Sequence, residues 1–241
     1  MDNIKYLYSN GCSYTEGYGL DNPEKERYSK FLANKFTAED INQSAGGGSN
    51  QRIFRTTYNW ISQNQDKLKD TLFVIQLSYP VRNEIWVNRG NKDNFDRNQG
   101  WISSEFYDYG GSWHGAQFGH DGYTAWESHQ RDTSVDKEEI NFDYVPNNKI
   151  CSTITWRYVV SLQSFFKFNN IKYIFFEGDI HTEGSLDKTC KITELVDFDC
   201  FYDEGFLQSA GNRRTPCNHP NAEVQIEWAD KLYSFYKGRY R

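Results

Sequence analysis

Three short blocks of this 241-residue sequence hold residue types that together could cleave an ester. Ser13 follows Gly11 at the end of a short β-rich run, His219 stands near the far end of the chain, and residues 46–48 are three glycines that open a helical pattern. A serine hydroxyl can attack an acyl carbon when a nearby imidazole accepts its proton. Backbone N–H groups at a helix start suit the oxyanion that then develops. The blocks therefore suggest nucleophilic acyl transfer.

Each block taken alone also has an ordinary explanation. Glycine and serine are common in turns, a histidine beside Pro220 can simply start a helix, and a glycine run can bind phosphate. The phosphate alternative is disfavoured because the G-x-G-x-x-G spacing and a P-loop lysine are both missing. Cys12 offers a second candidate nucleophile. Adjacent residues on an extended segment point in opposite directions, so only one of Cys12 and Ser13 is expected to face the imidazole, and we favour Ser13.

The elements around these blocks must bring them together. Apolar, β-rich runs predict four strands, at residues 4–9, 39–42, 71–78 and 171–177. Helical spacing of apolar residues predicts four helices, at residues 24–36, 49–68, 151–168 and 222–236. Ser49 and Asn221 are suitable N-caps for two of them. Alternating strands and helices indicate an α/β protein with a doubly wound parallel sheet, whose ligands bind beyond the carboxyl ends of the strands.

The region of about 86–150 does not share this alternation. It is rich in Gly, Asn, Asp and aromatic residues and shows no persistent period. A structureless loop of that length is improbable within a compact domain, so we expect an irregular, aromatic-rich insertion that forms a lid or subdomain. Trp101, Trp113 and Trp126 are candidates for a wall that stacks on a substrate sugar. The chain as a whole, residues 1–241, is expected to form one domain.

Composition narrows the classes of partner. A net charge of −6 and a pI near 5.4 disfavour a surface that tracks nucleic-acid phosphates. Five cysteines without CxxC or Cys/His spacing predict reduced thiols and no zinc site, and nothing suggests another metal or a cofactor. The first residues lack a secretory signal, and no apolar stretch reaches the length of a membrane span. We therefore expect a cytoplasmic protein without nucleic-acid or membrane partners.

The order of the blocks resembles the SGNH (GDSL-type) hydrolase superfamily, particularly phage-associated members whose first block reads Gly-Cys-Ser-aromatic-Thr. Here the first block is residues 11–15 (GCSYT), the second resembles residues 45–50 (AGGGSN), and the last is residues 219–221 (HPN) before the terminal helix. The resemblance spans almost the whole chain. It implies a three-layer α/β/α sandwich with a parallel, flavodoxin-like sheet. Its phage-associated members add two further expectations, a location in the virion and viral structural partners.

Carried over position by position, the resemblance implies a role for each block. Ser13 is the expected nucleophile and His219 the expected general base. The backbone N–H groups of Ser13 and Gly47 are the expected oxyanion donors.

Two positions depart from the family pattern. Where the family's third block has Gly-x-Asn, this chain reads Gln76-Leu77-Ser78, so the Ser78 hydroxyl replaces an amide as the third oxyanion donor. The family's acid, three residues before the histidine, is Pro216 here. Candidate replacements from the upstream segment are Asp199, Asp203 and Glu204. Arg82 and Glu84 resemble an Arg-x-Glu pair of similar phage proteins. Such a pair fits a structural ion pair at least as well as a substrate contact, and the two residues receive no catalytic role.

Two functions are compatible with these residues. The first is a serine esterase or deacetylase acting on a small-molecule or carbohydrate ester, such as an O-acetylated sugar. The second is a binding or structural module, such as a component of a viral particle, that keeps the fold without a complete active site. The two departures motivate this second function, since fold alone does not establish activity.

Overall fold

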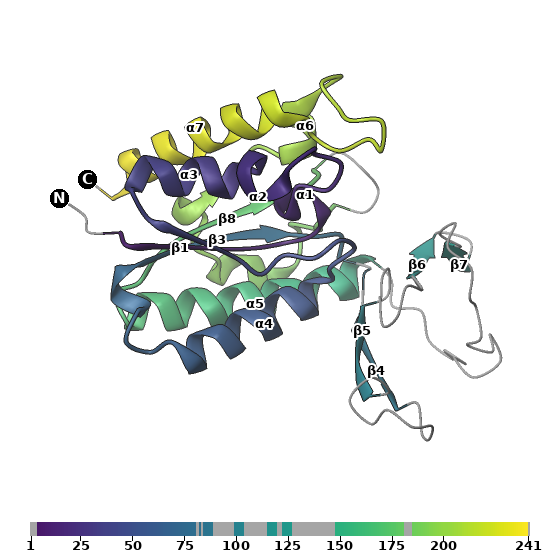
Figure 1. Ribbon diagram of the computed structural model, residues 1–241. Coiled ribbons are helices and arrows are strands. Elements are labelled where there is room, and N and C mark those ends of the chain that lie inside the picture. The colour runs from purple at the N-terminus through teal and green to yellow at the C-terminus, as the bar shows by residue number, and fades with distance from the viewer. Residues whose placement is uncertain are drawn as a thin grey trace.

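The computed structural model describes residues 4–80, 82, 84–88, 99–103, 115–119, 122–126, 148–180 and 185–240. Its centre is a five-stranded parallel sheet with strand order β2-β1-β3-β8-β9 (Figure 1). The strands are β1 (Tyr6–Asn10), β2 (Glu39–Asn42), β3 (Thr71–Leu77), β8 (Lys172–Glu177) and β9 (Phe201–Tyr202). This order is that of a flavodoxin-like doubly wound sheet, and it confirms the predicted α/β class.

Helices cover both faces of the sheet. The α-helices are α1 (Ser13–Glu16), α2 (Pro23–Glu26), α3 (Tyr28–Phe36), α4 (Asn50–Gln63), α5 (Asn148–Phe168), α6 (Phe206–Ala210) and α7 (Ala222–Arg239). Short 3-10 turns occupy Leu68–Asp70, Lys191–Leu195 and Phe198–Cys200. Figure 1 shows α3 and α7 side by side on one face and α4 with α5 on the other. The result is the three-layer sandwich expected from the sequence.

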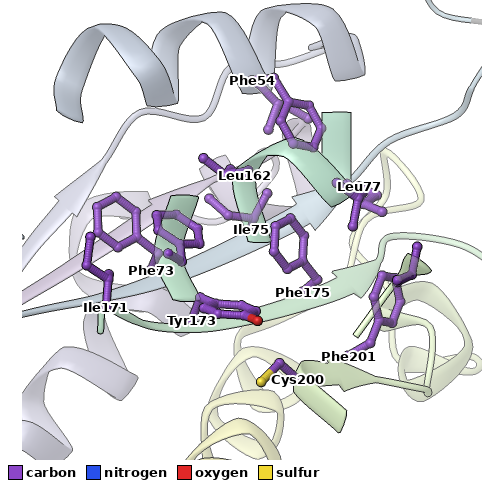
Figure 2. Close-up of a cluster of buried hydrophobic side chains, with 14 of the residues drawn as sticks. Phe54, Phe73, Ile75, Leu77, Leu162, Ile171, Tyr173, Phe175, Cys200 and Phe201 are labelled. Carbon is purple, nitrogen blue, oxygen red and sulfur yellow. The ribbon is translucent and has the colours of Figure 1, made fainter. Parts of the chain in front are cut away.

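Alternating side chains of the central strands build two apolar cores. In β3, Phe73 and Ile75 pack with α4 and α5, whereas Leu72 and Val74 pack with α3 and α7. Figure 2 shows the first cluster, in which Phe73 and Ile75 lie with Phe175 of β8. Because both faces of these strands are covered, each strand is apolar at nearly every position, which is why the sequence identified them clearly.

The helix predictions hold in outline and differ in detail. The expected helix at 24–36 is interrupted at Arg27, whose extended backbone (φ −71°, ψ 148°) separates α2 from α3. The expected helix at 49–68 ends at Gln63. The predicted N-caps are confirmed, since Ser49 accepts a hydrogen bond from Arg52 N (3.2 Å) and Asn221 accepts one from Val224 N (3.1 Å).

The expected insertion at about 86–150 lies largely outside the described residues. Within it, β4 (Glu84–Asn88) pairs antiparallel with β5 (Gln99–Ser103), and β6 (Gly115–Gly119) pairs antiparallel with β7 (Gly122–Trp126). All five cysteines are free thiols, as their odd number predicted. Among the helices that the structure describes, none has the length and apolar character to cross a membrane.

Candidate active site

The turn after β1 presents Ser13 at the carboxyl edge of the sheet. The strand ends at Asn10, whose buried side-chain amide donates to the carbonyl of Ile53 in α4 (2.9 Å). At Gly11 there is no room for a side chain, because a Cβ atom would lie 2.5 Å from Thr15 Oγ1. The close approach of Thr15 turns the chain into α1, and Ser13 is the first residue of that helix.

Gln76 of β3 holds this turn in place through hydrogen bonds. The sequence analysis named Gln76 only as part of the altered third block. Its Oε1 accepts from Thr15 Oγ1 (2.7 Å) and from the backbone N–H of Cys12 (3.3 Å), while its Nε2 donates to Cys12 Sγ (3.0 Å). The Cys12 thiol is buried in these contacts. The Cys12 thiol therefore points into the protein. The backbone is extended at Cys12 and helical from Ser13 onward, so the two residues do not share the extended segment that the sequence analysis assumed.

Ser13 and His219 meet although they are 206 positions apart in the sequence. Ser13 Oγ lies 2.8 Å from His219 Nε2, and His219 Nδ1 lies 2.8 Å from the carbonyl oxygen of Cys217. A carbonyl can only accept, so Nδ1 must carry a proton, and in the neutral imidazole Nε2 is then the bare, accepting nitrogen. The Ser13 hydroxyl therefore donates to Nε2. This is the tautomer that a general base needs.

The expected acidic residues lie elsewhere. Glu204 accepts from Lys231 Nζ (2.7 Å) and from the Tyr202 hydroxyl (3.1 Å), while Asp203 is exposed. Asp199 is also exposed, 3.9 Å from the guanidinium of Arg239. At His219 the position that a carboxylate would take is filled by the Cys217 carbonyl. A backbone atom thus does the orienting for which the sequence analysis sought an acid.

The surroundings of His219 favour its neutral form. The imidazole contacts the ring of Tyr14 (centroids 5.3 Å apart) and the ring of Tyr18 (5.1 Å). Burial lowers the pKa of His219 below its ordinary value, and the positive charge of Arg82 lowers it further, whereas the hydrogen bond to Cys217 opposes the shift. A neutral imidazole with a bare Nε2 is the form that can accept the Ser13 proton.

The glycine block packs directly against the Ser13 turn. A Cβ atom on Gly48 would lie 3.0 Å from the carbonyl oxygen of Gly11 and 3.8 Å from Cys12 Cα. Gly47 adopts a left-handed conformation (φ 65°), which favours glycine. The first and second sequence blocks are thus neighbours at one sheet edge, as their positions after parallel strands predicted.

Ser78 is tied to the same block through Asn50. The side chain of Asn50 donates to the carbonyl of Ser78 (2.9 Å) and accepts from its backbone N–H (2.8 Å). The hydroxyl of Ser78 accepts from Arg82 Nη1 (2.9 Å). The structure therefore brings Ser13, His219, the glycine block and Ser78 to one end of the sheet.

A partly buried chain of polar contacts leads away from Arg82, and the sequence analysis did not predict it. The Arg82 guanidinium stacks on the ring of Tyr79 (4.5 Å), and the Tyr79 hydroxyl donates to Asp179 Oδ2 (2.9 Å). Gln208 Nε2 donates to the other oxygen of Asp179. Burial also raises the pKa of Tyr14, which is hydrogen-bonded to Tyr79, to about 12. The signal that could have found Asp179 is its position just past the strand at 171–177, the rule that selected the other blocks.

The proposed sugar-stacking wall cannot be placed. Trp113 lies outside the described residues, and Trp101 and Trp126 belong to β5 and β7, whose side chains lie outside the description.

Comparison with solved structures identifies proteins of similar fold. The psychrotrophic esterase EstA from Pseudoalteromonas sp., in a structure inhibited by monoethylphosphonate, matches with a TM-score of 0.51 and 14% identity over 97% of each chain. TesA matches with a TM-score of 0.49 and 11% identity, over 97% of this chain and 99% of TesA. A carbohydrate esterase matches with a TM-score of 0.49 and 13% identity, over 98% of this chain and 66% of its own. At 14% identity the EstA match shows a shared fold, in agreement with the SGNH-type sandwich expected from the sequence.

Comparison at the level of sequence gives a family. No curated protein matches the chain. A family model described as a family of unknown function, DUF6071, matches residues 17–233. The match spans most of the chain, from the end of α1 to the middle of α7, and the protein therefore belongs to the family of unknown function DUF6071.

Proposed function

We propose that this protein is a serine hydrolase that cleaves carboxylic esters through Ser13 and His219. The observation that carries the proposal is the 2.8 Å hydrogen bond between Ser13 Oγ and His219 Nε2, in the tautomer that the Cys217 carbonyl imposes. The glycine block packed against the same turn supports it, because the family resemblance implies an oxyanion N–H donor at Gly47 of that block. The esterase EstA has the same fold, which is compatible with this reaction class.

The reaction follows from the direction of the hydrogen bond. As Ser13 Oγ bonds to the acyl carbon, its proton passes to His219 Nε2, and the carbonyl oxygen becomes an oxyanion. The imidazolium then gives this proton to the departing alkoxide, which leaves an acyl group on Ser13. Water attacks the acyl carbon while Nε2 takes its proton, and collapse of the second oxyanion returns that proton to Ser13 Oγ and releases the carboxylic acid.

The Cys217 carbonyl performs part of the work of an aspartate. It holds the imidazole in the productive tautomer, whose loss is a severe defect in serine proteases. It carries only a partial charge, however, so it stabilises the imidazolium less than a carboxylate does. We therefore expect turnover on simple esters to be lower than that of enzymes with a complete triad.

The substrate class that we propose is an O-acetylated carbohydrate. The support is the aromatic-rich sequence at about 86–150, including Trp101, Trp113 and Trp126, because flat rings stack on sugars. Acetate release from an acetylated polysaccharide, compared with release from p-nitrophenyl acetate, tests this choice. A preference for the small ester would assign the protein to small-molecule substrates instead.

Reaction with a fluorophosphonate probe tests the nucleophile. We expect covalent labelling of the wild-type protein at Ser13, located by tandem mass spectrometry, and none of Ser13→Ala. The neighbouring Cys12 is an internal control, since an adduct there would assign the chemistry to the thiol. Absence of labelling in a well-folded sample would sink the hydrolase proposal and favour a binding module that keeps the fold.

The pH dependence of kcat/KM should reflect the environment of His219. Because the base acts in its neutral form, activity falls as the pH drops through the pKa of His219. Burial and Arg82 lower this pKa from 6.5, so we expect the acid limb to have its midpoint below 6.5. Product release measured by chromatography across the acidic range gives the profile. A midpoint at or above 6.5 would mean that the imidazolium is stabilised by a group other than those described.

A further inference from the structure

Ser78 follows β3 at the same edge of the sheet as Ser13. In the pairing of β1 with β3, Asn10 is the partner of Ile75, and Ser13 and Ser78 each follow three residues later. Both therefore leave neighbouring parallel strands at the same sheet edge. Asn50 donates a hydrogen bond to the Ser78 carbonyl and accepts one from the Ser78 N–H, and the two bonds fix the backbone of Ser78.

Arg82 determines what this hydroxyl can do. Its Nη1 donates to Ser78 Oγ at 2.9 Å, so one lone pair of the oxygen is occupied and the hydroxyl hydrogen remains to be donated. A charge-assisted bond of this kind polarises the O–H group and makes it a better donor. A serine alone is a shorter and less firmly oriented donor than the amide it replaces, and Arg82 corrects both shortcomings.

The guanidinium is itself held in place. It stacks on the ring of Tyr79 at 4.5 Å, and the backbone N–H of Arg82 donates to the Tyr79 carbonyl (3.2 Å). The Tyr79 hydroxyl is anchored on Asp179, which Gln208 of α6 also contacts. The polar chain that begins at α6 thus ends at the hydroxyl of Ser78.

We propose that Arg82 is a positioning residue for the oxyanion: it orients and polarises the Ser78 hydroxyl, which donates to the developing negative charge in place of an asparagine amide. This inference rests on the proposed ester hydrolase function and extends it. Arg82 does not contact the reacting atoms in this scheme. It acts on the oxyanion through Ser78, so its effect on kcat at a pH well above the acid limb should disappear when Ser78 is removed.

Replacing Arg82 should also change the pH dependence of kcat/KM, which replacing a purely structural residue would not. The groups that face His219 are the phenols of Tyr14 and Tyr18, the Ser13 hydroxyl, and Cys217, whose carbonyl binds Nδ1. Arg82 adds a positive charge to this environment. Removal of that charge should shift the acid limb of the kcat/KM profile to higher pH, whereas lysine at this position should keep the limb near that of the wild type.

A double-mutant cycle on the full-length protein provides the test, with kcat and KM measured on p-nitrophenyl acetate. We expect Ser78→Ala to lower kcat about 10²-fold and Arg82→Gln to lower it about tenfold, each with little change in KM. The double variant should be no slower than Ser78→Ala, and Arg82→Lys should recover part of the loss. Arg157→Gln, at an exposed position on α5, removes the same charge elsewhere and should leave kcat unchanged.

The outcomes separate this inference from the proposed function. A wild-type protein that neither hydrolyses the ester nor reacts with the phosphonate probe overturns both. An active wild type for which the two losses simply multiply, or for which Arg82→Gln raises KM and leaves kcat unchanged, overturns the role of Arg82 alone. Thermal unfolding of each variant, with Arg82→Lys as the milder change, identifies a loss that comes from misfolding.

Discussion

Replacing His219 with alanine is expected to slow ester hydrolysis by about 10⁴- to 10⁶-fold, to the same level as Ser13→Ala. Ser13 donates its only hydroxyl proton to His219 Nε2, so neither residue is useful without the other. Because the two act as one unit, the variant that lacks both should be no slower than either single variant. Steady-state hydrolysis of p-nitrophenyl acetate, corrected for the spontaneous rate, measures all three.

His219→Gln is the matched control for this prediction. A glutamine amide can still hydrogen-bond to the Ser13 hydroxyl but cannot accept its proton, so the loss should be nearly as large as with alanine. Retention of more than about one hundredth of the wild-type rate in His219→Ala would show that another group removes the serine proton. Equal thermal stability of the variants is needed to attribute the loss to chemistry.

Gly11→Ala is expected to lower the free energy of unfolding by about 1–3 kcal/mol and to reduce kcat about 10²-fold. The new Cβ atom would lie 2.5 Å from Thr15 Oγ1 and 2.7 Å from Gln76 Oε1. Thr15 Oγ1 donates a hydrogen bond to Gln76 Oε1, which also accepts one from the N–H of Cys12, so neither atom can easily withdraw. The turn must shift instead, and Ser13 moves with it.

Gly238→Ala makes the same chemical change without the crowding. Gly238 lies in α7, and a Cβ atom there meets no other atom within 4 Å. Alanine favours the helix by up to about 1 kcal/mol, so stability should rise slightly and activity should stay the same. Urea unfolding and kcat of the two variants test the pair of predictions. If Gly11→Ala were as stable and as active as Gly238→Ala, the tight turn would not position the nucleophile.

The sequence contained enough information to predict the central strands and the meeting of the two reactive side chains. Val74 and Phe73 belong to opposite cores, so residues 72–75 of β3 are all apolar, and this run is easily recognised in the sequence. Because parallel strands end at one edge, residues that follow different strands converge there. This rule placed Ser13 beside the glycine block, and the helix cap Asn221 placed His219 just before α7.

Two features of the fold could not be predicted, because the sequence shows no local pattern for them. Strand β9 has only two residues, Phe201 and Tyr202, too few to show an alternation. Arg27 is a good helix former, yet it interrupts the helix at 24–36. In the structure its guanidinium forms an ion pair with the buried Asp40 of β2 (2.9 Å). That contact is tertiary and cannot be deduced from local spacing.

The orienting group of the site was equally hidden. The atom that holds His219 Nδ1 is the backbone carbonyl of Cys217, and every residue carries such a carbonyl. A search for acidic residues led to Asp203 and Glu204, whose carboxylates are directed elsewhere. Only the fold of the loop between α6 and α7, in which Asn218 adopts a left-handed conformation (φ 66°), brings that carbonyl to the imidazole.

The contact between α3 and α7 holds Ser13 and His219 together, so loss of activity would indicate local unfolding of this contact. Ser13 lies on the chain that leads into α3, and His219 lies on the chain that leads into α7. The two helices are joined by a hydrogen bond from Tyr28 N to Gln225 Oε1 (2.9 Å) and by the packing of Phe36 on Tyr236. Detachment of the C-terminal helix would separate the hydroxyl from the imidazole, while the sheet and the core beneath α4 and α5 stay intact. Inactivation should therefore precede global denaturation and coincide with loss of amide hydrogen-exchange protection in α7.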